Sequence, residues 1–121
     1  MKKNSLEKLK QLFSQFEEVL CVYLFGSHAE DKNNNLSDID IGVLLEDKFD
    51  KNLKLEMLST LTEKGYSNID LVIINNTDLL TSYEIVKNNF IIYSRSDFNE
   101  SSFFSLTVRK YLDFKPFLEV Q

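Results

Sequence analysis

The sequence is poor in the residues that build disulfides, zinc centres and flexible linkers. Its 121 residues include one cysteine, Cys21, one histidine, His28, one proline and three glycines. A single cysteine cannot form an internal disulfide, and one cysteine with one histidine is too small a set for a cysteine-based zinc site. The scarcity of proline and glycine excludes a collagen-like or linker-dominated chain. Nothing therefore points to an oxidising compartment.

Long apolar runs and an excess of positive charge are also missing. The longest apolar run, residues 19–25, is far shorter than the roughly 20 residues of a membrane-spanning helix. The first ten residues, MKKNSLEKLK, have no apolar stretch behind their lysines, which predicts no signal peptide. A net charge of −5 argues against direct, sequence-independent binding of nucleic acid. We expect a cytoplasmic protein that contacts neither membranes nor nucleic acids.

What is present predicts one globular domain over residues 1–121. The composition is 43% hydrophobic and 27% charged, and no internal repeat or linker divides the chain. Apolar residues at helical and at strand spacing alternate along the sequence. They predict an α/β (α+β) domain with a small mixed four-stranded sheet flanked by helices. The expected strands are 19–25, 38–45, 69–74 and 90–93, and the expected helices begin near residues 4, 51, 78 and 97.

The last predicted helix is rich in aromatic residues. Asp97 and Glu100 have the spacing of a capping pair, which predicts a helix from there to about Phe114 that Pro116 ends. Phe103 and Phe104 are adjacent and cannot share one helical face. One of the two is therefore expected to be exposed to a partner.

Two aspartates follow a Gly-Ser pair at a fixed interval. The first strand ends in Gly26 and Ser27, ten residues intervene, and Asp38 and Asp40 come next. Because strand side chains alternate, these aspartates share one face about 7 Å apart. Two carboxylates on one face can hold hard cations such as Mg²⁺. Gly42 follows on that face, and its lack of a side chain predicts room for a ligand beside the carboxylates.

A phosphate site and a third carboxylate complete the pattern. A glycine and a serine at a strand end let phosphate oxygens approach backbone N–H groups, so Gly26 and Ser27 are candidates for nucleotide binding. Asp70 begins the third predicted strand. If that strand lies beside Asp38 and Asp40, three carboxylates converge, as two-metal phosphoryl chemistry requires.

The run GSHAEDKNNNLSDIDIGVLL resembles the GS-x10-DxD motif of the polymerase-β-like nucleotidyltransferase superfamily. The chain is similar to minimal nucleotidyltransferase (MNT) domains within it, through NIDLVIIN and YEIVKNNFIIYS. Its ending, VRKYLDFKPFLE, resembles the C-termini of MNT antitoxins that are paired with HEPN toxins. The resemblance covers roughly residues 5–120.

The resemblance implies a fold, an activity and a partner. The expected protein is a Mg²⁺-dependent nucleotidyltransferase, with two ions, that moves AMP from ATP to a tyrosine of a HEPN ribonuclease toxin. By this resemblance, Asp38 and Asp40 bind metal, Asp70 binds metal and serves as the base, and Gly26 and Ser27 orient the outer phosphates.

Other interpretations stay open at this stage. Where the family commonly has basic residues after Gly-Ser, this chain has His28, Glu30 and Asp31, and the acidic pair disfavours a triphosphate. An antitoxin that only occludes its toxin is one alternative. A small-molecule nucleotidyltransferase is another, although such enzymes usually carry a further helical domain. The sequence leaves open the acceptor, the nucleotide base and the oligomeric state.

Overall fold

The computed structural model describes residues 3–26, 29 and 38–119. Helices and strands follow one another in the predicted order, helix, strand, strand, helix, strand, helix, strand, helix. The elements are α1 (Lys3–Ser14), β1 (Val19–Phe25), β2 (Ile39–Leu45), α2 (Leu53–Glu63), β3 (Ile69–Ile73), a 3-10 turn (Ile74–Asn76), α3 (Leu79–Val86), β4 (Ile91–Ser94) and α4 (Glu100–Glu119). None of the described helices is long and apolar enough to cross a membrane.

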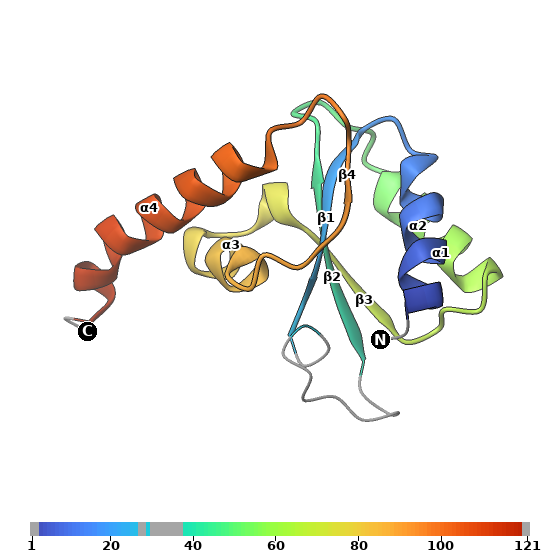
Figure 1. Ribbon diagram of the computed structural model, residues 1–121, viewed down its shortest axis with the longest axis horizontal. Coiled ribbons are helices and arrows are strands. Elements are labelled where there is room, and N and C mark those ends of the chain that lie inside the picture. Colours follow the sequence, from blue (N-terminus) through green and yellow to red (C-terminus); the bar gives the residue numbers. More distant parts are fainter. Residues whose placement is uncertain (1–2, 27–28, 30–37, 120–121) are drawn as a thin grey trace.

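The four strands form one mixed sheet in the order β3-β2-β1-β4. β1 pairs antiparallel with both β2 and β4, whereas β2 and β3 run parallel. The parallel pair needs a crossover, which α2 supplies (Figure 1). The mixed four-stranded sheet that the sequence predicted is thereby confirmed.

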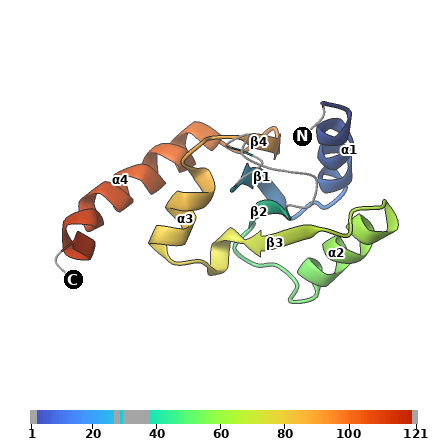
Figure 2. The same ribbon diagram turned by 90° about the horizontal axis from the view of Figure 1, so that it is seen from below.

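Helices cover both faces of the sheet. α1 and α2 lie on one face, and α3 and α4 lie on the other (Figures 1 and 2). Each face has its own apolar core, because alternate strand residues point in opposite directions. Leu9, Phe13, Val22, Leu24 and Met57 belong to the α1–α2 core, and Cys21, Tyr23, Ile74, Ile85 and Val86 form the α3–α4 core.

Local signals explain where the two middle helices begin and end. Asp78 caps α3 by accepting a hydrogen bond from the backbone N–H of Thr81 at 2.8 Å. At the end of α2, Gly65 has a φ of +94°, and the N–H of Tyr66 donates to the Leu61 carbonyl at 2.9 Å. This left-handed glycine and backward hydrogen bond form a Schellman cap.

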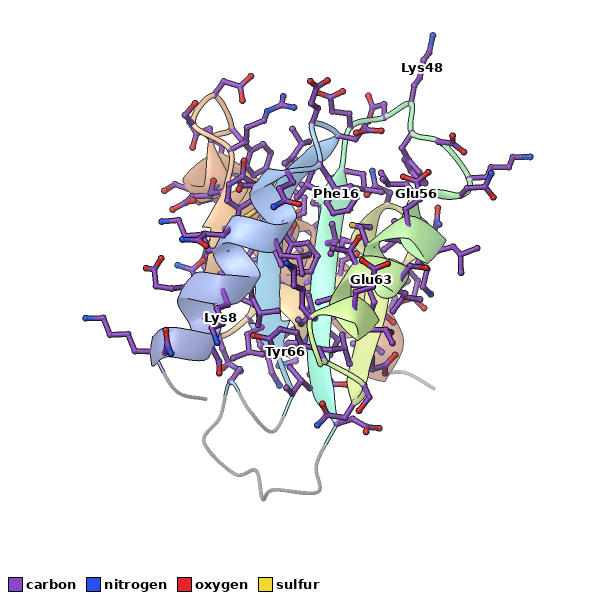
Figure 3. All side chains as sticks on the ribbon, turned by 90° about the vertical axis from the view of Figure 1, so that its right-hand side faces the viewer. Lys8, Phe16, Lys48, Glu56, Glu63 and Tyr66 are labelled. Atoms are coloured by element: carbon purple, nitrogen blue, oxygen red, sulfur yellow. The ribbon has the colours of Figure 1, made fainter. Side chains whose placement is uncertain are left out.

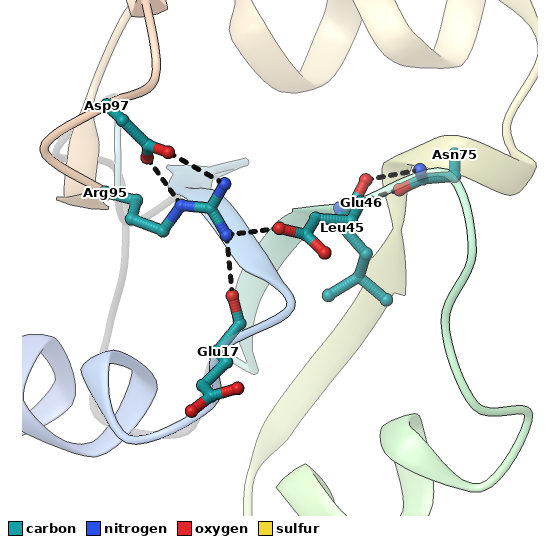
Figure 4. A network of polar contacts seen from close by, with 6 residues as sticks. All are labelled: Glu17, Leu45, Glu46, Asn75, Arg95 and Asp97. Carbon is teal, nitrogen blue, oxygen red and sulfur yellow. Dashed lines mark hydrogen bonds and ion pairs between the residues drawn. The ribbon is translucent and has the colours of Figure 1, made fainter.

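One arginine joins three segments at the far end of the sheet. Arg95, just after β4, donates to Glu46 after β2 and, at 2.8 Å, to the backbone carbonyl of Glu17 before β1 (Figure 4). It also donates to both carboxylate oxygens of Asp97, at 2.6 and 3.2 Å. Beside this cluster, the side chain of Asn75 pairs with the backbone N–H and carbonyl of Leu45.

The start and the end of α4 differ from the sequence prediction. Asn99 caps the helix by accepting from the N–H of Ser102 at 3.0 Å, because Asp97 is engaged by Arg95. Pro116 lies inside α4 and does not end it. A proline has the φ of a helix, so the helix continues beyond it. The cost is the hydrogen bond that its N–H would have made and the crowding of its ring against the preceding turn.

The exposed apolar side chains of α4 are not the pair that the sequence singled out. Phe103 and Phe104 are both half-buried against the α3–α4 core, so neither is exposed to a partner as the sequence predicted. The large exposed apolar side chains of this helix are Leu106, Leu112, Phe114 and Phe117. Tyr111 anchors the helix through its ring, which stacks on Tyr83 of α3 at 3.8 Å between centroids.

Candidate active site

Gly26 directly follows β1 and has a backbone conformation that only glycine adopts readily. Its φ is +72°, in the left-handed region. A Cβ at this position would lie under 3.0 Å from Oδ2 of Asp40, the residue that is paired across the sheet with Phe25. The absence of a side chain therefore lets the backbone of Gly26 sit directly against the Asp40 carboxylate.

Asp40 and Asp70 are direct partners on neighbouring parallel strands. The register pairs Ile39 with Ile69 and Asp40 with Asp70. Paired strands lie about 4.8 Å apart, so the two carboxylates leave the same face of the sheet side by side. β3 therefore lies where the sequence argument required it, beside the strand that carries Asp40.

A backbone hydrogen bond fixes this register at its open end. The N–H of Ile39 donates to the carbonyl of Asn68 at 2.8 Å, which joins the start of β2 to the start of β3. Sequence reasoning did not single out Asn68. Its only signal is its position two residues before Asp70.

Asp38 lies just before β2 and is exposed, as is Asp70, whereas Asp40 is half-buried. Within the part of the chain that the structure describes, no three carboxylate, histidine or cysteine side chains are grouped closely enough to hold a metal ion. Mg²⁺ needs no such group, because it commonly binds one or two carboxylates and completes its shell with substrate phosphates and water. The paired carboxylates of Asp40 and Asp70 supply hard oxygen ligands and fit that requirement.

The space over Gly42 is occupied by protein, contrary to the sequence prediction. A Cβ on Gly42 would lie 2.5 Å from Cγ2 of Ile85 and 3.4 Å from two side-chain carbons of Ile74. The missing side chain therefore makes room for α3 rather than for a ligand. α3 thus covers the face of the sheet beside Asp40, over Gly42.

Two titratable side chains of β1 on this face do not offer a nucleophile. Cys21 and Tyr23 of β1 are fully buried in the α3–α4 core. Burial raises the pKa of the Cys21 thiol to about 11, and burial also raises the pKa of Tyr23. Both groups stay neutral near pH 7, so neither supplies an anionic nucleophile there.

Ser27 lies outside the described residues, as do His28, Glu30 and Asp31. Their predicted parts in phosphate binding, or in opposing it, therefore stay predictions. The same holds for the roles of the aspartates in metal binding and catalysis, although their placement is now known.

A family model described as polymerase beta, nucleotidyltransferase, matches residues 7–98. The chain belongs to the polymerase beta nucleotidyltransferase family. The matched range contains Gly26, Asp38, Asp40 and Asp70, so the family resemblance that the sequence suggested is confirmed.

One relative is similar to part of this nucleotidyltransferase. A protein adenylyltransferase, MntA of Shewanella oneidensis, is 29% identical over 83 residues, which are 69% of this chain and 60% of the relative. The match therefore spans less than two thirds of MntA.

Solved structures share the fold of this nucleotidyltransferase. A chain of a toxin–antitoxin crystal structure with AMP-PNP has a TM-score of 0.76 at 23% identity, covering 97% of this chain and 94% of that one. A chain of a complex between tri-AMPylated Shewanella oneidensis HEPN toxin and MNT antitoxin has a TM-score of 0.75 at 21% identity, covering 99% and 94%.

Proposed function

We propose that this nucleotidyltransferase transfers AMP from ATP to a tyrosine of a HEPN ribonuclease toxin, and so acts as its antitoxin. The observation that carries the proposal is the side-by-side pairing of Asp40 and Asp70 next to the left-handed Gly26. The likeness to the adenylyltransferase MntA supports AMP as the transferred group. The fold shared with chains of toxin–antitoxin complexes supports a toxin as the partner.

The proposal includes Mg²⁺, with two ions in the complete site. Asp38 and Asp40 would hold metal at the start of β2, and Asp70 would hold it from β3. The carboxylates of this site repel the phosphates of ATP, and the chain as a whole has a net charge of −5. Bound there, Mg²⁺ would neutralise the phosphate charge. Gly26 would offer its backbone to the outer phosphates, together with Ser27.

Asp70 also has the proposed role of general base. A tyrosine hydroxyl has an ordinary pKa of about 10, so it is a weak nucleophile at pH 7 until a base takes its proton. As that proton passes to Asp70, the phenol oxygen bonds to the α-phosphorus of ATP. The bond between that phosphorus and the oxygen that bridges the α- and β-phosphates breaks, and pyrophosphate leaves.

Transfer to a purified HEPN ribonuclease partner tests the proposal. With ATP and Mg²⁺, the partner should gain the mass of AMP on a tyrosine, and EDTA should prevent this. Asp40→Asn and Asp70→Asn should each lower the rate by about 100-fold or more. Asp47→Asn, at an exposed position beyond the other end of β2, is the matched control and should keep the wild-type rate.

Circular dichroism and urea unfolding of each variant would show that the fold is intact. A partner that gains AMP equally from the wild type and from Asp40→Asn would place the chemistry elsewhere. A partner that is silenced without any mass change would support occlusion and overturn AMP transfer.

A further inference from the structure

A second concave surface lies on the opposite face of the sheet from the aspartates. It is a cavity of about 300 Å³ between α1 and the end of α2. Its lining, here called the α1–α2 groove, consists of Lys8, Gln11, Leu12, Gln15, Lys64 and Tyr66. Figure 3 shows Lys8 and Tyr66 near each other in this region and Lys48 at the far end of the molecule.

Helical spacing and the α2 cap bring these residues together. Lys8 and Gln11 are three residues apart on α1, so they share one side of the helix, and Gln15 follows its last residue. On the facing wall, the Schellman cap places Lys64 and Tyr66 on either side of Gly65.

The groove is positively charged in an acidic protein. Lys8 and Lys64 come from opposite walls, and no carboxylate lines the groove. Neither lysine forms an ion pair with any residue that the structure describes. The carbonyls of Thr60, Leu61 and Thr62 at the end of α2 accept backbone hydrogen bonds. This helix end keeps the partial negative charge of the helix dipole, and Lys64, which lies there, offsets it.

The remaining lining suits a flat organic molecule. Leu12 is 4% exposed and forms an apolar floor, and the half-buried ring of Tyr66 offers an aromatic surface. The carboxamides of Gln11 and Gln15 can each donate and accept hydrogen bonds. The volume lies at the lower end of the range for small-ligand pockets, about 300–1,000 Å³.

We propose that the α1–α2 groove binds a small organic phosphate with a flat body, of the nucleoside monophosphate kind. The two lysines match the charge of a phosphate monoester, about −1.5 to −2 at pH 7. The flat body lies over Leu12 and against the ring of Tyr66. This site is separate from the aspartates and needs no metal ion.

That last property makes the proposal testable apart from the proposed function. AMP is titrated into the ¹⁵N-labelled full chain in EDTA at low salt, where a metal-dependent site takes up no nucleotide. Backbone amide signals of residues 8–15 and 64–66 should shift. Adenosine and inorganic phosphate should each bind more weakly than AMP, because each lacks one of the two recognised parts.

The decisive variant removes both lysines and is compared with one of equal charge. Lys8→Ala with Lys64→Ala should weaken AMP binding about tenfold, since both charge-assisted contacts are lost. Lys48→Ala with Lys54→Ala, also exposed, should leave it unchanged. Equal weakening in both pairs, or shifts centred outside the groove, would overturn the site. Phosphate binding as tightly as AMP would overturn the flat organic ligand.

Discussion

At the scale of single residues, Gly26 and Gly65 share a left-handed backbone and differ in what surrounds them. The φ angles are +72° and +94°. A Cβ at Gly65 would meet nothing within 4 Å, whereas one at Gly26 would meet the Asp40 carboxylate. Both substitutions by alanine therefore strain the backbone, but only one displaces a candidate catalytic group.

We predict that Gly26→Ala and Gly65→Ala each lower the free energy of unfolding by about 1–2 kcal/mol, the cost of a left-handed alanine. Gly26→Ala should in addition reduce AMP transfer about 100-fold, because the carboxylate of Asp40 must move. Urea denaturation and the partner-labelling assay measure the two effects. Equal activity in the two variants would mean that the position of Asp40 does not matter for transfer.

At the scale of elements, the contact between α3 and β2 depends on Gly42. Ile85 of α3 packs over this glycine, with its Cγ2 atom where a Cβ would come within 2.5 Å. Both residues are fully buried or nearly so, and interiors are too closely packed to absorb a methyl group freely.

We expect Gly42→Ala to destabilise the protein by about 1–3 kcal/mol through overpacking. Leucine has no branch at Cβ and so lacks the Cγ2 atom that causes the overlap. Gly42→Ala should therefore cost less in an Ile85→Leu background, which thermal or urea unfolding in a double-mutant cycle would show. Strictly additive costs would contradict a direct contact between these two side chains.

Arg95 joins the end of β4 to the rest of the sheet and also binds Asp97. The Arg95 guanidinium, through its hydrogen bonds to Asp97, holds the pKa of that carboxyl below its ordinary value. A lowered folded-state pKa gives stability that is present above the unfolded value, about 3.9, and is lost as pH falls through the folded value.

Asp97→Asn should therefore be less stable than the wild type at pH 7, and the gap should close below about pH 4. Urea unfolding across this pH range measures the gap. In an Arg95→Gln background the pH-dependent part should disappear. A gap of the same size at every pH would mean that Asp97 acts through packing or backbone geometry instead.

At the scale of the whole molecule, catalysis and occlusion differ in stoichiometry. An enzyme acts repeatedly, whereas an occluding antitoxin protects only by staying bound. About one tenth of an equivalent of this protein, with ATP and Mg²⁺, should inactivate nearly all of a HEPN ribonuclease partner if it turns over. Residual ribonuclease activity against added protein gives the answer. Protection that stops at one-to-one amounts, or persists in Asp70→Asn, would favour occlusion.

The exposed apolar side chains near the end of α4 also bear on how the whole molecule could bind a partner. Leu112, Phe114 and Phe117 are exposed where the helix extends away from α3 (Figure 1). Asp40→Asn keeps this surface unchanged and is expected to lose AMP transfer. If the variant at equimolar amounts still protects against the HEPN ribonuclease partner, the protection comes from binding and not from chemistry.

Local patterns along the chain were enough to predict the order of the elements and the spacing of the motif. Hydrophobic periodicity is a local property, so residues 19–25 and 38–45 were recognisable as strands from their own side chains. In the structure the second of them begins one residue later, at Ile39. Alternation within the expected strand also predicted that Asp38 and Asp40 share one face, although β2 begins after Asp38, at Ile39. The interval between the Gly-Ser pair and the aspartates pointed to the family, because it sets which residues of β1 and β2 face each other. In the structure Gly26 lies against Asp40.

Features that depend on residues far apart in the chain could be read only from the folded protein. The register that sets Asp40 beside Asp70 comes from parallel pairing across a whole crossover, and no local signal fixes it. Ile85 takes the space over Gly42, and Arg95 joins Glu46 to the backbone carbonyl of Glu17. In each case two distant segments meet, and the outcome follows from packing and hydrogen bonding that exist only in the folded chain.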